Sequence, residues 1–237
     1  MSASFSFWAV IPAAGNSRRM GTVAAPKQYL PLRGRSVLEW SAAPFLARPD
    51  CAGVVVVLAA EDRQWNTLEL SRNLRVANAV GGAERWGSVQ QGLKALRDQA
   101  GQDDWILVHD AARPCLSCHD LQQLIDALQA DAVGGLLAAP VSDTLKRSDD
   151  AGRVAATVDR AGLWRALTPQ MFRYGLLDRA LSEVALRRVS VTDEAQAVEL
   201  LGLRPRLVAG SADNIKITVP EDLQRAEHIL ATMEQQR

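Results

Sequence analysis

The residues AVIPAAGNSRRMG at positions 9–21, followed by PKQY at positions 26–29, decide the fold of this chain. The apolar run at 7–11 is rich in β-formers, which predicts a buried strand. The small residues after it would let a ligand approach backbone N–H groups closely, and phosphates favour such donors. Arginines and a lysine in the same two stretches add the positive charge that phosphate oxygens need. The chain therefore opens with a strand and a phosphate-binding loop, or, on composition alone, with a strand and a solvated basic loop.

This loop has neither of the two common nucleotide-binding spacings. The G-x-x-x-x-G-K-[ST] pattern of a Walker A loop and the G-x-G-x-x-G pattern of a dinucleotide fingerprint are both absent from it.

Strand-like and helix-like segments alternate along the chain, which predicts βαβ units. We therefore expect an α/β fold with a Rossmann-like, mostly parallel sheet and helices on both faces, in a single domain over residues 1–237. The predicted strands cover 7–11, 53–58, 74–80, 105–108, 135–139, 206–208 and 215–219. The predicted helices cover 37–46, 86–96, 121–130, 176–184, 192–201 and a last helix that opens at 220–222.

Residues 140–166 depart from this alternation. The turn-forming cluster at 149–152 lies between two polar β-like stretches at 144–147 and 154–158, which predicts a β-hairpin. Few of its side chains are apolar enough to pack on the core. We expect the hairpin to project as an arm and to pack against another subunit.

Composition excludes several classes of protein. The 27 basic and 27 acidic residues give zero net charge, which argues against a nucleic-acid or membrane-surface partner. No apolar run approaches the roughly 20 residues of a membrane span, and no signal peptide is recognisable. Three cysteines make no disulfide framework, so we expect a cytoplasmic protein.

One cysteine motif matches two further functions. Cys115 to His119 fit C-x-x-C-H, typical of c-type haem attachment, and contain the C-x-x-C of thiol redox proteins. Because a helix is predicted to open at 119–121, capped by Ser117 or Asp120, we interpret these as incidental surface cysteines.

Ligands of a parallel sheet bind outside the carboxyl ends of its strands, so the loops after the strands are the candidate site. A glycine-rich loop follows the strand at 74–80, and Ser88 at its end can donate or accept a hydrogen bond. Asp110 follows the strand at 105–108, where a carboxylate holds Mg²⁺ or a ribose hydroxyl, or simply caps a turn. We interpret its neighbour His109 as a bystander in a packed strand end.

Separated motifs carry a resemblance to a known family. PAAG, RM and PKQY near the N-terminus, VHDAARP at 108–114 and DNIKIT at 213–218 resemble those of the sugar-alcohol phosphate cytidylyltransferases. The hairpin, LTPQ at 167–170 and VTDEA at 191–195 narrow the likeness to the 2-C-methyl-D-erythritol 4-phosphate cytidylyltransferase family. The likeness runs from residue 9 to about residue 223. Ala83 departs from it, since an Asp is common there.

The resemblance implies transfer of CMP from CTP to 2-C-methyl-D-erythritol 4-phosphate, with release of pyrophosphate, in the non-mevalonate isoprenoid precursor pathway. It implies that Arg19, Lys27 and Lys216 are catalytic. It implies a nucleotide site of Pro12, Ala13, Ala14, Gly15, Gly82, Ala83, Ser88, Asp110 and Ala111. It implies acceptor contacts from Arg113, Thr144, Arg160, Thr168 and Thr192, although helix capping is an alternative for the last two. It also implies Mg²⁺ at Asp110 and a homodimer whose arm brings Thr144 and Arg160 to the neighbouring subunit.

The residues of the predicted site suit the transfer of CMP to a phosphate monoester. A phosphate monoester is already an anion near neutral pH, because its second pKa is about 6, so no general base is needed. Fixed positive charge and positioning remain the main tasks. The alternatives are a ribitol 5-phosphate cytidylyltransferase, a sugar-phosphate nucleotidylyltransferase with another base, and a non-catalytic nucleotide-binding module.

Overall fold

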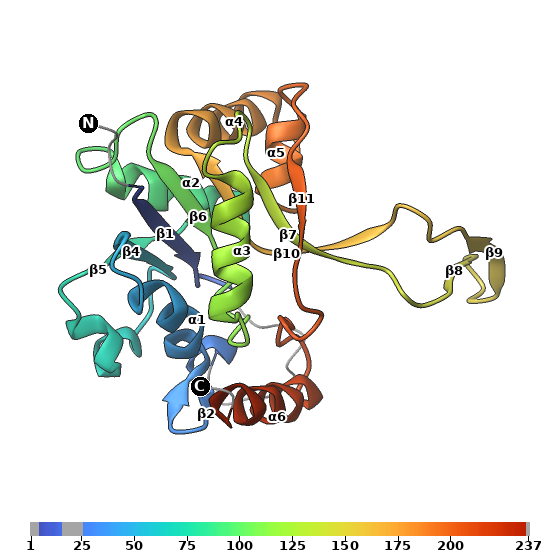
Figure 1. Ribbon diagram of the computed structural model, residues 1–237, viewed down its shortest axis with the longest axis horizontal. Helices are drawn as coiled ribbons and strands as arrows, with labels where there is room; N and C mark the ends of the chain where they lie inside the picture. Colours follow the sequence, from blue (N-terminus) through green and yellow to red (C-terminus); the bar gives the residue numbers. More distant parts are fainter. Residues whose placement is uncertain (1–4, 16–25, 236–237) are drawn as a thin grey trace.

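The computed structural model describes residues 5–15 and 26–235, and a central sheet organises them (Figure 1). The strands are β1 (Phe7–Pro12), β2 (Pro31–Leu32), β3 (Arg35–Ser36), β4 (Cys51–Leu58), β5 (Val76–Val80), β6 (Trp105–Val108), β7 (Gly135–Pro140), β8 (Leu145–Ser148), β9 (Val154–Val158), β10 (Trp164–Arg173) and β11 (Arg206–Ala209). Of these, β2 pairs only with β3 and β8 pairs only with β9, in two small hairpins outside the central sheet. The helices are α1 (Val37–Leu46), α2 (Arg85–Leu96), α3 (Cys118–Leu128), α4 (Tyr174–Arg187), α5 (Glu194–Glu199) and α6 (Glu221–Gln235), with 3₁₀ turns η2 (Lys27–Tyr29), η3 (Trp65–Thr67) and η4 (Glu69–Arg72).

The sheet has seven strands in the order β11-β7-β10-β6-β1-β4-β5. β1 runs parallel to both β4 and β6, β5 is parallel to β4, and β11 is parallel to β7. The prediction of a mostly parallel sheet is therefore confirmed. The sequence did not predict β10, which runs antiparallel to β6 on one side and to β7 on the other.

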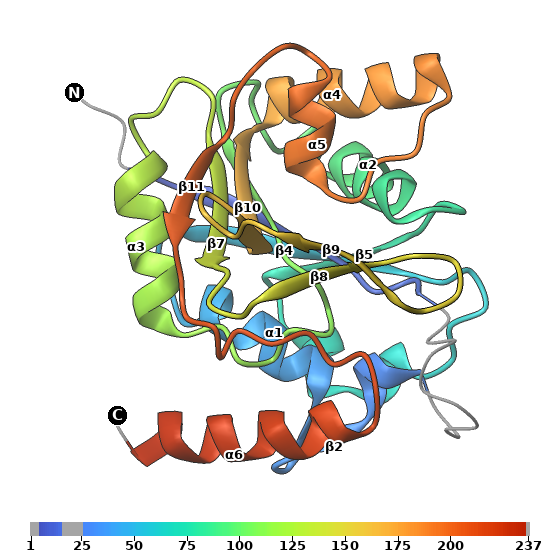
Figure 2. The same cartoon turned by 90° about the vertical axis from the view of Figure 1, so that its right-hand side faces the viewer.

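Helices cover both faces of the sheet, as predicted, and each face has its own core (Figure 2). Alternate residues of β1 divide between them. Phe7 and Ile11 pack with α1 and α3, whereas Val10 packs with α2 and α4. This burial on both sides explains why the strand has a nearly continuous apolar sequence. A third, smaller cluster joins α6 to α1 through residues such as Trp40 and Leu230.

The predicted hairpin is confirmed and projects from the sheet as an arm (Figure 1). β8 and β9 form a separate antiparallel ribbon, with Leu145 opposite Val158. Asp149 closes the turn, because its side chain accepts hydrogen bonds from the backbone N–H groups of Ala151 and Arg153. The arm leaves and re-enters the sheet at paired positions, since the Val141 N–H donates to the Leu163 carbonyl at 3.0 Å.

The predicted strand at 215–219 is wrong. This segment lies outside the sheet and packs over the loop that follows β6. The Ile217 N–H donates to the Ala112 carbonyl at 2.8 Å, and the Ile217 side chain is fully buried beside α6. Packing against a loop and a helix therefore produced the alternating pattern that predicted a strand.

The cysteine prediction is correct for one residue and wrong for the other. Cys118 is exposed at the first position of α3, where Ser117 caps the helix as predicted. Cys115 is buried in the cluster between α1 and α6, and burial raises the pKa of its thiol to about 12. A thiol held protonated in this way is a weak nucleophile and a weak ligand.

In the described part of the chain, no helix combines the length and the apolar character that crossing a membrane requires.

Candidate active site

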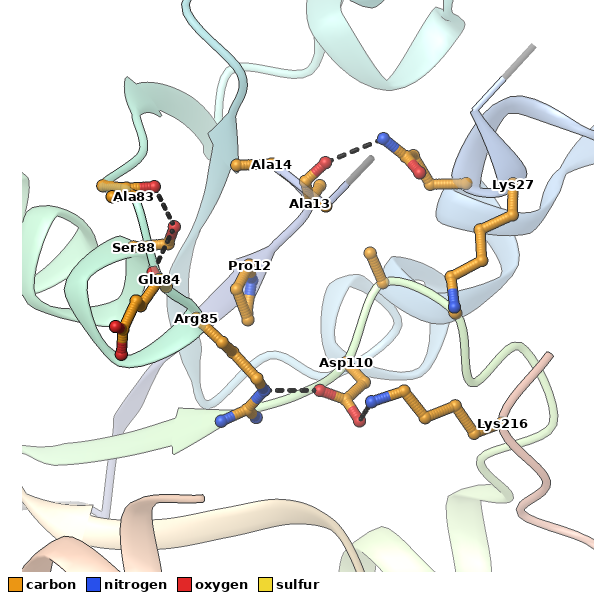
Figure 3. Close-up of a pocket in the computed structure, with 15 residues that line it drawn as sticks. Pro12, Ala13, Ala14, Lys27, Ala83, Glu84, Arg85, Ser88, Asp110 and Lys216 are labelled. Atoms are coloured by element: carbon orange, nitrogen blue, oxygen red, sulfur yellow. Dashed lines mark hydrogen bonds and ion pairs between the residues drawn. The ribbon is translucent and has the colours of Figure 1, made fainter. Parts of the chain in front are cut away.

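A pocket of about 200 Å³ lies beyond the carboxyl ends of β1, β5 and β6 (Figure 3). This is the edge of a parallel sheet at which ligands bind. Loops from the N-terminal and C-terminal regions of the chain both line the pocket. All nine residues predicted to bind the nucleotide line this pocket, and the predicted catalytic residues Lys27 and Lys216 line it as well. Arg19 falls outside the described residues. The cations from the N-terminal and C-terminal regions therefore converge on one pocket, as predicted.

The small-residue loop after β1 is held in place by backbone contacts on two sides. The Ala13 N–H donates to the Val57 carbonyl of β4 at 2.7 Å. The Ala13 carbonyl accepts from the buried amide of Gln28 at 2.7 Å, which fastens the loop to η2. Gln28 belongs to the PKQY motif, so the two stretches that open the chain form one wall of the pocket.

The glycine-rich loop forms the opposite wall and depends on a close backbone approach. A Cβ at Gly82 would lie 2.9 Å from the carbonyl carbon of Gly87, in the first turn of α2. The Ser88 hydroxyl is buried and lies 3.2 Å from the Glu84 carbonyl, to which it donates. The absence of a side chain at Gly82 therefore lets this wall of the pocket lie directly against the backbone of α2.

Asp110 lies at the floor of the pocket, where three cationic side chains surround it. Figure 3 shows Arg85 and Lys216 reaching its two oxygens from opposite sides, at 3.0 Å and 2.9 Å. Arg113 makes a third contact at 3.4 Å. Burial alone would raise the pKa of this carboxyl, but Arg85, Lys216 and Arg113 outweigh it and hold the pKa far below its usual range. Asp110 is therefore an anion at every ordinary pH.

Sequence reasoning missed a buried ion pair behind Asp110. The guanidinium of Arg85 makes two parallel contacts with Glu194, at 2.6 Å and 3.1 Å, in addition to its bond with Asp110. Glu194 is the first residue of α5 and is fully buried. Both residues lie within stretches of sequence discussed above. Arg85 and Glu194 are, however, 109 positions apart in the chain, so their spacing in the sequence did not indicate a contact.

Lys27 reaches across the pocket mouth to the C-terminal segment. Its ammonium group donates to the Ile217 carbonyl at 2.8 Å, next to the backbone of Lys216. Lys27 thus bonds to the residue that follows Lys216 in the chain, and this bond fixes the positions of the two lysines relative to each other.

His109 and Thr168 lie beneath the pocket. The Thr168 hydroxyl accepts from the Asp110 N–H at 3.1 Å and lies 2.9 Å from His109 Nδ1. The other ring nitrogen of His109 lies 3.0 Å from the Arg113 carbonyl, which can only accept, so Nε2 carries the proton. Burial lowers the pKa of His109 to about 4, and the ring is neutral. His109 is fully buried, consistent with a bystander, and the hydroxyl of Thr168 faces Asp110 rather than the pocket.

None of the five predicted acceptor residues lines the pocket of this chain. Arg113 is buried, with its guanidinium on Asp110 and on the Asn214 carbonyl. Thr144 and Arg160 flank the two strands of the arm, and neither lines the pocket of its own subunit. Thr192 is exposed just before α5, but Asp193 rather than Thr192 caps that helix.

Within residues 5–15 and 26–235, no three His, Cys, Asp or Glu side chains gather closely enough to hold a metal ion. The carboxylates that line the pocket are those of Asp110 and Glu84. Since both oxygens of Asp110 already accept bonds from cations, this carboxylate could serve a metal ion only as a shared ligand.

Together these features define a class of protein. An α/β sheet with a small-residue loop, a glycine-rich loop and converging cations at its carboxyl edge is a nucleotide-phosphate site of the nucleotidyltransferase kind. The chain belongs to the 2-C-methyl-D-erythritol 4-phosphate cytidylyltransferase family, whose model matches residues 7–232.

Individual relatives agree with this assignment. The 2-C-methyl-D-erythritol 4-phosphate cytidylyltransferase of Pseudomonas aeruginosa is 53% identical over 223 residues, covering 94% of this chain and 95% of the relative. The enzyme of the same name from Thermus thermophilus has a solved structure with a TM-score of 0.79 and 32% identity, covering 96% of this chain and all of that one. A solved 4-diphosphocytidyl-2C-methyl-D-erythritol synthase reaches a TM-score of 0.83 at 40% identity, covering 96% and 99%.

Proposed function

We propose that this protein transfers CMP from CTP to 2-C-methyl-D-erythritol 4-phosphate and releases pyrophosphate, a step of isoprenoid precursor synthesis. The observation that carries the proposal is the convergence of Lys27 and Lys216 on the pocket between the two backbone loops. Family membership over residues 7–232 supports the choice of base and acceptor. The substrate CTP and the free thiols of the chain support a cytoplasmic location.

The reaction is an in-line displacement. An oxygen of the acceptor's phosphate monoester attacks the α-phosphorus of CTP, and the bond from that phosphorus to the bridging oxygen of the β-phosphate breaks. The electron pair leaves with pyrophosphate. Because the attacking oxygen is already ionised near neutral pH, no side chain needs to remove a proton. Lys27 and Lys216 offset the repulsion between the two anions and stabilise the charge that grows on the phosphoryl oxygens.

Asp110 supports the cations rather than the phosphates. Its carboxylate would repel a triphosphate, but three cations surround it, so their sum with Asp110 is positive. In this arrangement Asp110 holds Lys216 at the pocket floor. We place Mg²⁺ in the reaction as part of the Mg²⁺–CTP substrate; the triphosphate oxygens would be its principal ligands, and Asp110 and Glu84 are the carboxylates that line the pocket.

The acceptor site is completed by a second copy of the chain. Thr144 and Arg160 lie on the projecting arm, and neither meets the pocket of its own subunit. An arm that docks on a partner would bring the Arg160 guanidinium to the acceptor phosphate there. Arg160 now donates to the Ser142 carbonyl, which orients it along the base of the arm.

Pyrophosphate release tests the activity. Purified protein is incubated with CTP and Mg²⁺, and with either 2-C-methyl-D-erythritol 4-phosphate or ribitol 5-phosphate. We expect turnover with the first acceptor and none with the second. Turnover with ribitol 5-phosphate alone would reassign the acceptor, and release with neither would leave a nucleotide-binding module.

Mixing two inactive variants tests the shared site. Lys27→Ala removes a pocket cation and Arg160→Ala removes the arm cation proposed to bind the acceptor phosphate, so a mixed dimer holds one intact site out of two. Statistical mixing at equal concentrations then restores about a quarter of the wild-type activity. If the mixture stays as inactive as its components, each subunit uses its own Arg160 and the arm proposal is wrong.

A further inference from the structure

One guanidinium in the pocket lining, that of Arg85, holds two carboxylates, of which Asp110 lines the pocket and Glu194 does not. Arg85 comes from the first turn of α2, Asp110 from the end of β6 and Glu194 from the start of α5. Nε of Arg85 donates to Asp110 Oδ1 at 3.0 Å, while its two terminal nitrogens donate to the two oxygens of Glu194. Such a two-pronged contact fixes the plane of a guanidinium as well as its position.

Glu194 is well placed to fix that plane. Its side chain is 0% exposed and does not line the pocket, so it does not contact a bound nucleotide. The buried amide of Gln170 anchors the start of α5, because it accepts from the Ala195 N–H at 2.8 Å and donates to Asp193 at 3.0 Å. The carboxylate of Glu194 is therefore held rigidly from its own backbone outward.

Stability alone is a poor explanation for this pair. Removing two charges from water is expensive, and buried ion pairs often contribute less to stability than apolar residues of the same size. A fixed orientation of Arg85 has a clearer use. Asp110 lies between Arg85 and Lys216, so the side that Arg85 occupies determines which oxygen remains for Lys216.

We infer that Glu194 and Arg85 are positioning residues, which hold the Asp110 carboxylate in the one orientation that keeps the Lys216 ammonium in the pocket. This inference rests on the proposed cytidylyl transfer for its kinetic consequence. Glu194 acts through Arg85, and Arg85 acts through Asp110 on Lys216, which is the member of this chain of contacts that meets the reacting phosphates.

The kinetic test uses Glu194→Gln, which keeps the size of the side chain and removes its charge. Glu199→Gln, at an exposed position of the same helix, is the matched control. Assays run at a temperature at which circular dichroism shows each variant folded. We expect kcat to fall about 10- to 100-fold in Glu194→Gln, because small misplacements of a reacting group have effects of this size. KM for CTP and the activity of Glu199→Gln stay near wild type. Arg85→Lys, which keeps the charge but loses the fork, shows the same loss.

A double-mutant cycle separates positioning from mere stability. If Glu194 acts through Asp110, then Glu194→Gln lowers kcat by less than about twofold in an Asp110→Asn background, since coupled residues are not additive. Rates are followed with radiolabelled CTP so that slow variants are measurable. A full 10- to 100-fold loss in that background, or wild-type kcat in Glu194→Gln alone, overturns the inference.

A second readout needs no activity. The Arg85 Nε–H signal in a ¹H–¹⁵N spectrum reports its bond to Asp110, and we expect a sharp, slowly exchanging signal in the wild type. In folded Glu194→Gln this signal broadens or exchanges faster, whereas Glu199→Gln leaves it unchanged. A signal unaffected by Glu194→Gln refutes the positioning link. Absence of pyrophosphate release by the wild type refutes the proposed function instead, so the two failures are distinct.

Discussion

At the scale of single residues, the site is an arrangement of fixed charges around one anion. Lys216, Arg85 and Arg113 approach Asp110, and Lys27 lies across the same pocket. Preorganised charges of this kind stabilise a transition state without having to reorganise during the reaction. Mutations here should therefore change the rate more than the fold.

Replacing Lys27 with alanine should lower kcat about 10²- to 10³-fold, the usual cost of removing one charge that meets the transition state. The variant also loses the bond to the Ile217 carbonyl, so thermal unfolding is measured alongside the steady-state kinetics. Lys94→Ala, at an exposed position on α2, is the control. A Lys27→Ala enzyme that keeps more than about half of the wild-type kcat would remove Lys27 from the mechanism.

His109 should make the stability of the fold depend on pH. Burial lowers its pKa from 6.5 to about 4, so the unfolded chain takes up a proton first as the pH falls. The contribution of neutral His109 is complete above pH 6.5 and is lost as the pH falls towards 4. A shift of this size corresponds to about 3 kcal/mol.

Urea unfolding between pH 7.5 and pH 4.5 measures this effect. We expect His109→Gln to lose about 2–3 kcal/mol less stability than the wild type over that range, because its buried side chain does not titrate. His228→Gln, on the exposed side of α6, is the control. Equal pH dependence in His109→Gln and the wild type would show that the ring is not a buried neutral group.

At the scale of elements, the pocket depends on how closely the glycine-rich loop approaches α2. Gly82→Ala should lower the melting temperature and weaken CTP binding, because its Cβ would lie 2.9 Å from backbone of Gly87. Overpacking of this kind costs about 1–3 kcal/mol.

Calorimetric titration with CTP and thermal unfolding check the two parts of that prediction. Gly87→Ala is the matched control, since its added Cβ would meet only the Gly82 Cα, at 3.7 Å. Equal melting temperatures and equal CTP affinities in the two variants would contradict the idea that the pocket depends on the close approach of Gly82 to the backbone of α2.

The elements also show what the sequence could and could not predict. Local patterns identified the parallel strands and the arm, since continuous apolar runs and a polar turn cluster are local signals. β10 was missed because Thr168, Pro169 and Gln170 interrupt its apolar residues, and its register with β7 shifts at the same place. The segment at 215–219 had a strand's alternation but no strand beside it.

The candidate site, too, contains features that the sequence could predict and features that it could not. All nine residues that the motifs predicted to bind the nucleotide line one pocket, because the loops after parallel strands meet at one edge of the sheet. The Arg85–Glu194 pair could not be predicted, since it depends on how α2 and α5 pack. The burial of Thr168 likewise follows from the position of β10 beneath Asp110.

At the scale of the whole molecule, the arm is an excursion between two neighbouring strands. Trp164 pairs with Pro140 in the sheet, so the two ends of the arm lie side by side. Replacing residues 141–163 with a two-residue Asn-Gly turn should therefore convert β7 and β10 into an ordinary hairpin. We expect a folded monomer that binds CTP as the wild type does but transfers no CMP.

Analytical ultracentrifugation, CTP calorimetry and pyrophosphate release test the shortened chain together. The control is the full-length protein carrying Lys146→Ala, a change confined to an exposed position of β8. A shortened chain that still dimerises, or that still turns over, would show that other surfaces join the subunits or complete the site.

The pairing of β7 with β10 at the base of the arm also has an evolutionary consequence. Insertions, deletions and substitutions between residues 141 and 163 leave the register of β7 and β10 untouched, because that register is set where the two strands meet. If the arm joins two subunits, as we propose, natural variants can change which subunit they pair with while the pocket keeps its sequence, and two paralogues in one cell could cease to mix without any loss of turnover.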